Sequence, residues 1–448
     1  MKKAFFKSMK IAALSIPILC MLCLSSCHDD IGDVDEVHDT VPPVDPGTPP
    51  VTPQDTTLRV TSLSPATVHY GDTLVINGKN FSTTMTNNTV VIGGLAVAVV
   101  AASNTSLKVI TPALVHTTSE VKVTVRGNVV TAGNITYVPD VFVTGYENNS
   151  ASSFAKYWKN GSPVIVGPLG SIAYSMSLPG NDIYIAGHVR NGNTNLATYW
   201  KNGTAVTLGV NESDAKSIFV NGADVHVSGW EIINGFDNAR YWRNGAAFQL
   251  DAANSTGNGI AGMGNDVYVA GSRRSSQGVF EPVLWKNTEA GTVLGVSNQH
   301  RFAYAIYISG SDIYAAGTQN NAVTGLPMAT YWKNGSPVHL TDGALTDAIA
   351  TSIFVSGADV YVAGYEAQHD PGKPAVAKYW KNGVETKLTD GSKTAYANSI
   401  YVWENDIYVL GDEDKPDGAN ILKYWKNGVP VDLTDGTFQS AAYCIILR

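Results

Sequence analysis

The chain has 448 residues, of which 44% are hydrophobic and only 15% charged, and its formal net charge is −8. Because proteins bind nucleic-acid phosphates through basic faces, this acidic balance argues against a nucleic-acid partner. The four cysteines are too few for a disulfide scaffold. The 43 glycines and 21 tyrosines favour an all-β chain with many turns.

The first 26 residues have the pattern of a secretory signal peptide. Four lysines precede an apolar run over residues 11–24, which is too short to span a bilayer. The run ends in Leu24-Ser25-Ser26-Cys27, which resembles a bacterial lipobox. This resemblance implies cleavage before Cys27 and its acylation, so that Cys27 anchors the protein in outer-membrane lipid. The alternative is an ordinary signal peptide followed by an incidental cysteine.

Residues 27–57 form an acidic, proline-rich linker after the predicted lipidation site. Between residues 28 and 57 there are eight acidic residues and neither lysine nor arginine, and six prolines fall between residues 42 and 53. Such a segment buries little apolar area, so we expect an extended, solvated tether. Acidic residues directly after a lipidated cysteine resemble the surface-export signal of Bacteroidota lipoproteins. That resemblance implies display on the cell surface, and a periplasm-facing protein is the alternative.

Residues 58–138 predict a small β-sandwich, because short β-branched runs alternate with glycine, asparagine and proline turns. The segment also resembles the IPT/TIG family of immunoglobulin-like domains. The matching pieces are Ser64-Pro65, Gly71-Asp72-Thr73, Ile76–Phe81, Gly93-Gly94, Thr111-Pro112 and Tyr137. The resemblance implies a spacer or docking module in place of an active site.

Two motifs recur seven times over residues 139–448. One is an aspartate and a short strand that ends in glycine, as in Asp359–Gly364. The other is typified by Tyr-Trp-Lys-Asn-Gly, with its tryptophan at 158, 200, 242, 285, 332, 380 and 425. Seven four-stranded copies of about 44 residues predict a seven-bladed β-propeller. The region begins on the second strand of a blade and ends at 441–447 with the pattern of a first strand. We therefore predict that the C-terminal strand completes blade 1 and closes the ring.

The repeated aromatic and acidic residues have a structural and a functional interpretation. A tryptophan at one strand position is typical of packing between blades, and seven sugar-stacking platforms are the alternative. The recurrent aspartate before the second strand favours turn chemistry over an array of carboxylates. Asp412, Asp414 and Asp417 before Gly418 partly match a calcium loop, but Pro416 occupies a ligand position. We therefore predict neither a metal nor a cofactor.

The loops that follow the second strands carry most of the variation among the seven copies, and variable loops on a rigid scaffold commonly form binding sites. Several of these loops pair an aromatic residue with glutamate, which suits the C–H face and the hydroxyls of a pyranose. The candidate ligand-binding residues are Tyr146, Glu147, His188, Trp230, Glu231, Arg273, Tyr365, Glu366, Asp412 and Glu413. Nearby arginines and histidines at 190, 273, 274, 300, 301 and 369 would suit an anionic sugar instead. Local loop packing is the structural alternative.

The sequence contains no nucleophile elbow, His-Glu-x-x-His zinc motif or phosphate-binding loop, so we predict a non-catalytic protein. The order of parts along the chain resembles that of the surface glycan-binding lipoproteins of Bacteroidota: a lipobox, an acidic tether, an immunoglobulin-like spacer and a terminal domain. This resemblance implies an extracellular glycan as the ligand. A protein-interaction or adhesion scaffold at the outer membrane is the first alternative, and a glycosidase or polysaccharide lyase is the second.

Overall fold

The computed structural model describes residues 55–114, 116–148, 152–252, 254–295, 300–370 and 372–448. The chain divides into two units, residues 1–55 and 56–448. The predicted signal peptide, Cys27 and most of the acidic linker lie outside the described residues. The described part is all-β, as predicted, with a single short 3-10 turn, η1 (Met85–Asn87), and no α-helix. A search of these residues for a helix long and apolar enough to cross a membrane finds none.

The predicted sandwich consists of two sheets of short strands. One sheet has the order β1-β3-β7-β6, and the other has the order β2-β9-β8-β4-β5. Side chains alternate between exposed and buried along β3 and β8, so that Leu74, Ile76, Val121 and Val123 fill the space between the sheets. The strands are β1 (Arg59–Ser64), β2 (Thr67–Val68), β3 (Thr73–Lys79), β4 (Asn88–Ile92), β5 (Leu95–Val97), β6 (Val99–Ala102), β7 (Ser106–Ile110), β8 (Thr118–Val125) and β9 (Asn128–Tyr137).

The remaining strands form seven antiparallel sheets of four strands each, which are the blades of a propeller. The innermost strands, from blade 1 to blade 7, are β37 (Ser440–Leu447), β13 (Ser171–Ser177), β17 (Ser213–Asn221), β21 (Ser255–Met263), β25 (Arg301–Ser309), β29 (Thr346–Ser356) and β33 (Ala395–Trp403). The second strands are β10 (Val141–Asn148), β14 (Tyr184–Asn191), β18 (Asp224–Ile233), β22 (Asp266–Arg274), β26 (Asp312–Asn320), β30 (Asp359–Gln368) and β34 (Asp406–Asp414).

Two further strands complete each blade towards its outer edge. The third strands are β11 (Ser153–Lys159), β15 (Thr194–Lys201), β19 (Phe236–Arg243), β23 (Phe280–Lys286), β27 (Pro327–Lys333), β31 (Val376–Lys381) and β35 (Asn420–Lys426). The fourth strands are β12 (Ser162–Leu169), β16 (Thr204–Thr207), β20 (Ala246–Gln249), β24 (Thr292–Val293), β28 (Ser336–His339), β32 (Val384–Lys387) and β36 (Val429–Asp432).

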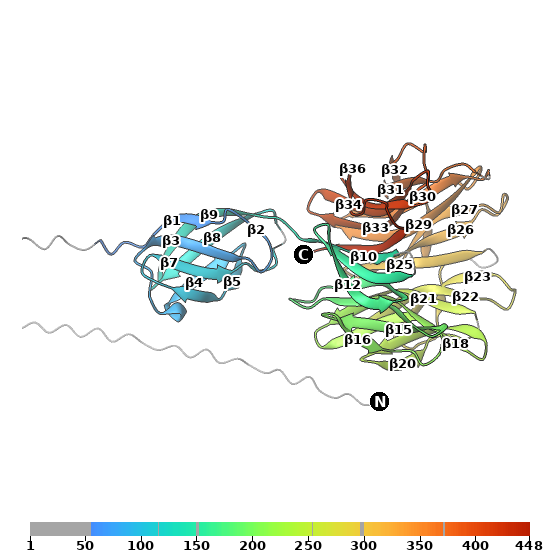
Figure 1. Cartoon of the computed structure of the whole chain (residues 1–448), viewed down its shortest axis with the longest axis horizontal. Coiled ribbons are helices and arrows are strands. Elements are labelled where there is room, and N and C mark those ends of the chain that lie inside the picture. The colour runs from blue at the N-terminus through green and yellow to red at the C-terminus, as the bar shows by residue number, and fades with distance from the viewer. Residues whose placement is uncertain (1–54, 115, 149–151, 253, 296–299, 371) are drawn as a thin grey trace, which may run out of the picture. The chain divides into compact units, whose positions relative to one another are not determined.

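The ring is closed by the C-terminal strand, which confirms the prediction from the sequence. β37 pairs antiparallel with β10, from Val141 opposite Leu447 to Glu147 opposite Ser440. Figure 1 shows this red strand beside the green β10. Each inner strand contacts the inner strand of the next blade, and β37 contacts both β33 and β13. The first and last segments of the propeller are therefore held in one sheet, and β37 gives blade 1 the same four strands as the other six blades.

The repeated aspartate is a structural residue that fastens the turn between the third and fourth strands. In blade 3, Asn244 donates from Nδ2 to Asp224 at 2.7 Å and accepts at Oδ1 from the Val225 amide at 2.8 Å. Arg243 pairs with the second oxygen of Asp224 at 2.6 Å. The same three contacts, with lysine in place of arginine, recur in the other six blades. The Asp and Lys-Asn motifs are thus two halves of one clamp.

All seven repeated tryptophans lie in the core, and each is at most 2% exposed. The interpretation as packing between blades is confirmed, and sugar-stacking platforms at these positions are excluded by their burial. Trp242 packs over Gly229, where an added Cβ would lie 3.1 Å from the indole ring. The same close approach of glycine and tryptophan recurs in blades 2, 4, 6 and 7, so glycine at this position of the second strand leaves room for the tryptophan of its own blade.

Candidate functional site

Every inner strand contains a β-bulge opposite the glycine that ends the repeated aspartate motif. In blade 3, Ala215 pairs with Gly229 and Ser217 pairs with Ser228, which leaves Lys216 as the extra residue. A Cβ on Gly229 would lie only 1.9 Å from the backbone oxygen of Asp214, so only glycine fits opposite the bulge. The same register shift makes the extra residues of the seven blades Tyr443, Tyr174, Lys216, Asn258, Tyr304, Thr351 and Asn398.

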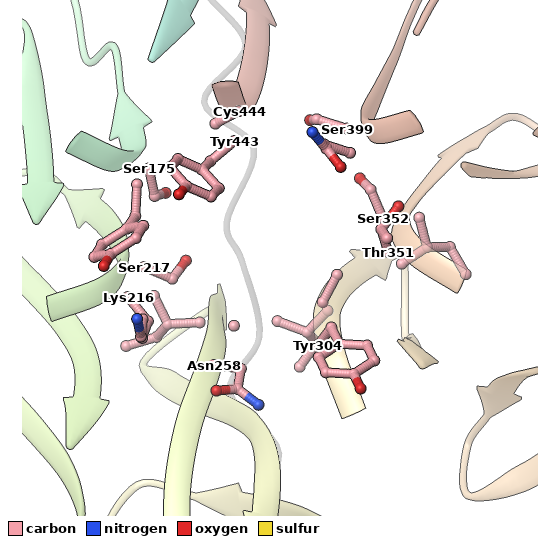
Figure 2. A pocket seen from close by; sticks show the side chains of 17 residues that line it. Ser175, Lys216, Ser217, Asn258, Tyr304, Thr351, Ser352, Ser399, Tyr443 and Cys444 are labelled. Carbon is pink, nitrogen blue, oxygen red and sulfur yellow. The ribbon is translucent and has the colours of Figure 1, made fainter. Parts of the chain in front are cut away.

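These seven bulge residues line one cavity of about 410 Å³ in the centre of the ring (Figure 2). The residue after each bulge also lines it, and all seven of these are small: Cys444, Ser175, Ser217, Gly259, Ala305, Ser352 and Ser399. Three isoleucines, at 260, 306 and 353, complete the lining. Because the residues after the bulges are small, they leave the cavity open. The volume of the cavity is in the range of small-molecule pockets.

Three bulge residues use their donors to fasten one blade to the next. Asn258 donates to the Ala303 carbonyl at 2.8 Å, and Thr351 donates to the Ala397 carbonyl at 2.7 Å. Asn398 likewise donates to the Ala442 carbonyl at 3.0 Å. In each pair the acceptor is the residue before the bulge of the following blade. These side chains therefore stabilise the ring while still lining the cavity.

The larger bulge residues contact one another along the wall of the cavity. The Tyr443 and Tyr174 rings meet edge to face with centroids 5.0 Å apart. The Lys216 ammonium lies 3.9 Å from the centre of the Tyr174 ring, a cation–π distance. Burial and neighbouring carboxylates raise the pKa of the Tyr174 and Tyr443 hydroxyls, so both stay neutral and can donate and accept hydrogen bonds.

A buried carboxylate, Asp214, stands behind this wall. It accepts hydrogen bonds from Nδ1 of His188 and, at 2.8 Å, from the Lys216 ammonium. Burial by itself would raise the pKa of Asp214, but the His188 hydrogen bond and the Lys216 charge outweigh it and hold the pKa below its usual range. Asp214 is therefore ionised at neutral pH and neutralises Lys216.

A second buried carboxyl, Asp412, has the opposite electrostatic character. It accepts hydrogen bonds from the amides of Asn398 at 3.1 Å and Asn420 at 3.4 Å, and no ion pair involving it is found among the described residues. Burial raises the pKa of Asp412 to about 6, although the two amides oppose the rise. Asp412 also raises the pKa of Tyr146 and Tyr443, which places it close to both rings.

Five of the residues predicted from the sequence lie beside the cavity, on the second strands. Tyr146 contacts Tyr443 with ring centroids 6.4 Å apart, and His188 contacts Tyr174 at 5.8 Å. Each of the five is the residue directly after the glycine opposite the bulge, and none of them lines the cavity itself: Tyr146, His188, Trp230, Tyr365 and Asp412. Tyr146, His188 and Asp412 thus contact residues that line the cavity, whereas Trp230 and Tyr365 share with them only the strand position.

The other five predicted residues point away from the cavity, because side chains alternate along a strand. Glu231 is buried and pairs with Arg240 at 2.9 Å, and its carboxylate also accepts from the Val210 amide. The remaining four are engaged in the same way: Glu147 with Lys156, Glu366 with Lys378, Glu413 with Lys393 and Lys423, and Arg273 with Asp251 and Glu281. These ion pairs join the second strand of a blade to neighbouring strands and loops.

The reasoning from the sequence missed the seven bulge residues themselves. Their signal is present in every inner strand as a variable residue between two small ones, as in Ala215-Lys216-Ser217. A strand with period-two alternation would send Ala215 and Ser217 to one face and Lys216 to the other. The bulge instead brings both Lys216 and Ser217 to the cavity. Within the described ranges, no group of three or more histidine, cysteine or acidic side chains could hold a metal ion.

Comparison with known proteins identifies one part of the chain. Residues 58–138 match the IPT/TIG domain family, which confirms the resemblance seen in the sequence. Curated protein sequences give no match. Among solved structures, a protein of unknown function from Bacteroides thetaiotaomicron has a TM-score of 0.43 at 12% identity, covering 88% of this chain and 99% of that one.

Two auxiliary nutrient binding proteins are also similar at 12% identity. The one from Bacteroides thetaiotaomicron has a TM-score of 0.33 and covers 87% of this chain and 98% of its own. The one from Bacteroides ovatus has a TM-score of 0.30 and covers 79% of this chain and 94% of its own. Likenesses at this level do not establish what this chain binds.

Proposed function

We propose that the protein is a non-catalytic, surface-anchored lipoprotein that binds an extracellular glycan in the central channel of its propeller. One observation carries the proposal. The seven blades share their aspartate, glycine, tryptophan and asparagine, yet differ at the bulge, where tyrosine, lysine, asparagine and threonine face a common cavity. The residues that build the blades are thus the same in all seven, while the residues that face the central cavity differ. Such an arrangement suits a binding site for one asymmetric ligand.

The chemistry of the lining supports a carbohydrate ligand. Tyrosine faces pack against the C–H faces of pyranose rings, while amides and hydroxyls exchange hydrogen bonds with sugar hydroxyls. The cavity offers three tyrosines, two asparagines and a threonine at the bulges, and serines from four strands beneath them. A volume of about 410 Å³ suits one or two sugar units.

The placement of the charged groups supports binding over catalysis. Among the described residues, those that line the cavity include no carboxylate and no histidine. Asp214 lies behind the wall and is engaged by Lys216 and His188, and Asp412 is engaged by two amides. Glycoside hydrolysis needs a pair of carboxyl groups that reach the scissile bond. In this protein, Asp214 and Asp412 are instead held by contacts with neighbouring side chains.

Affinity electrophoresis against a panel of polysaccharides tests the proposal. We expect retardation without new reducing ends or unsaturated products. The variant Ser217→Trp, which would fill the cavity, should abolish retardation, whereas Ser217→Ala should leave it intact. Equal retardation of both variants would place the ligand elsewhere. Product formation would establish an enzyme, and an absence of retardation together with a co-purifying outer-membrane protein would favour a protein-interaction scaffold.

The surface location is a separate part of the proposal and depends on Cys27 and the acidic linker. The Cys27→Ser variant should appear in the soluble fraction, while the wild-type protein incorporates labelled palmitate and stays with the outer membrane. Protease added to intact cells should remove a surface-displayed propeller. Protection in intact cells with cleavage after lysis would instead indicate the periplasm-facing orientation.

A further inference from the structure

Two aromatic walls face each other across the cavity. Tyr443 lies on the inner strand of blade 1 and Tyr304 on that of blade 5, and Figure 2 shows them on opposite sides of the space. Tyr443 is braced by Tyr174, and Tyr304 stacks on Phe302 with centroids 6.2 Å apart and planes 10° apart. Tyrosine side chains therefore border the cavity on two opposite sides.

The cavity holds one charged group among the described residues that line it, the Lys216 ammonium. This charge is already neutralised, because Asp214 accepts from it at 2.8 Å and is only 8% exposed in its side chain. An anionic ligand that approaches Lys216 would also meet the negative charge of Asp214, which His188 holds in place. Asp412, behind the Tyr443 wall, adds negative charge when it is ionised. The charges around the cavity therefore offer no net attraction to an anion.

The other cations that the sequence offered for an anionic sugar lie outside the cavity lining. Arg190 and Arg274 each donate to a backbone carbonyl of their own loop, at 3.1 and 3.2 Å. Arg273 pairs with Asp251 and Glu281, and His369 with Asp347. An acidic sugar held by these side chains would therefore lie outside the channel.

We infer that the sugar bound in the channel is uncharged, and that Asp214 determines this specificity by neutralising Lys216. The inference rests on the proposed glycan-binding function. The two tyrosine walls select the ring by its apolar faces, and the surrounding amides and hydroxyls select its hydroxyl groups. Asp214 disfavours uronic and sulfated sugars because its negative charge offsets that of Lys216, the one cation among the described residues that line the cavity.

Matched oligosaccharides test this inference in the full chain. Each pair has one member with a C6 hydroxymethyl group and one with a C6 carboxylate, such as galactan and polygalacturonate oligomers. We expect isothermal titration to show binding of a neutral member, with a Kd that changes less than about twofold between low and high salt. Preference for the carboxylate member, or an affinity that falls steeply with salt, would overturn the inference and leave glycan binding intact. Binding of no sugar at all would overturn the proposed function itself.

The variant Asp214→Asn tests the role of Asp214 directly. It frees the Lys216 ammonium, so the carboxylate oligomer should gain about tenfold in affinity while the neutral oligomer changes little. The double variant Asp214→Asn/Lys216→Met is the matched control and should lose that gain. A circular dichroism spectrum and a melting curve confirm that each variant folds. If the single and double variants bind the carboxylate oligomer equally, Asp214 does not set the specificity, and the salt dependence of the wild-type protein still tests the neutrality of the ligand.

Discussion

Folding shifts the pKa values of the two buried carboxyls, Asp412 and Asp214, in opposite directions, and the effect of Asp412 on stability can be worked out in magnitude. Its pKa rises from 3.8 to about 6 on folding. Because the folded state binds this proton more tightly than the unfolded state, the protein loses stability as the pH rises from about 4 through 6. A difference of about 2.2 between the two pKa values corresponds to about 3 kcal/mol, at about 1.36 kcal/mol for each pH unit.

The variant Asp412→Asn removes this titration and keeps the size of the side chain. Its fixed cost, the loss of an amide hydrogen bond, is about 1 kcal/mol and does not depend on pH. The free energy of unfolding of the variant minus that of the wild type should therefore rise by about 2 to 3 kcal/mol between pH 4 and pH 8. Urea unfolding at each pH, followed by tryptophan fluorescence, measures the difference.

Asp214→Asn is the matched control, because folding lowers the pKa of this carboxyl. Its contribution to stability is present above pH 4 and is lost as the pH falls through its folded pKa, so the variant should lose most at neutral pH. From pH 4 to pH 8 the Asp214→Asn difference should therefore stay nearly constant and shrink only below pH 4, whereas the Asp412→Asn difference should rise between pH 4 and pH 6. If the free energies of unfolding of Asp412→Asn and of the wild type differ by a constant amount from pH 4 to pH 8, the pKa of Asp412 is not raised by burial, and the argument fails.

Three further predictions concern the framework that holds the channel. Gly229→Ala should lower the free energy of unfolding by at least about 3 kcal/mol, because its Cβ would lie 1.9 Å from the Asp214 backbone oxygen. Gly245→Ala, where the Cβ enters open space, should lower it by about 1 kcal/mol because of the positive φ at that position. Urea midpoints compare the two. Trp332→Ala should cost about 3 to 5 kcal/mol in the same assay, since this side chain is fully buried. Deletion of residues 440–448 removes β37 and should abolish the cooperative melting transition seen by calorimetry; a truncated protein that melts like the wild type would show that closure by β37 is dispensable.

The architecture of the propeller was predictable from sequence because its signals are local and repeated. Asp224 and Asn244 lie in turns whose chemistry is visible in single copies, and seven copies made the blade count secure. The closure by β37 followed from strand counting alone, since one inner strand was missing at the start and one was left over at the end. The buried tryptophans were predictable because a large side chain at one strand position in every blade is typical of a core.

The channel was not predicted, because it depends on a one-residue shift in register. Alternation along an unbroken strand directs Tyr174 and Ser175 to opposite faces, whereas the bulge brings both to the cavity. The roles of the glutamates were hidden for a related reason. Glu231 meets Arg240 only once the second and third strands are paired, and the loops between these strands differ in length from blade to blade. Contacts set by pairing register are not visible in residue type or order alone.

The positions of the repeated and the variable residues argue for one ligand for each chain. A propeller that binds one sugar at each blade must repeat its binding residues. The repeated tryptophan and the repeated Asp–Lys–Asn clamp supply no such site, because they are occupied by packing and by one another. The residues that vary converge on a single axis, where the seven inner strands contribute unlike side chains to one cavity. Sevenfold regularity thus builds the ring, and departure from it at the bulges gives that ring one asymmetric cavity.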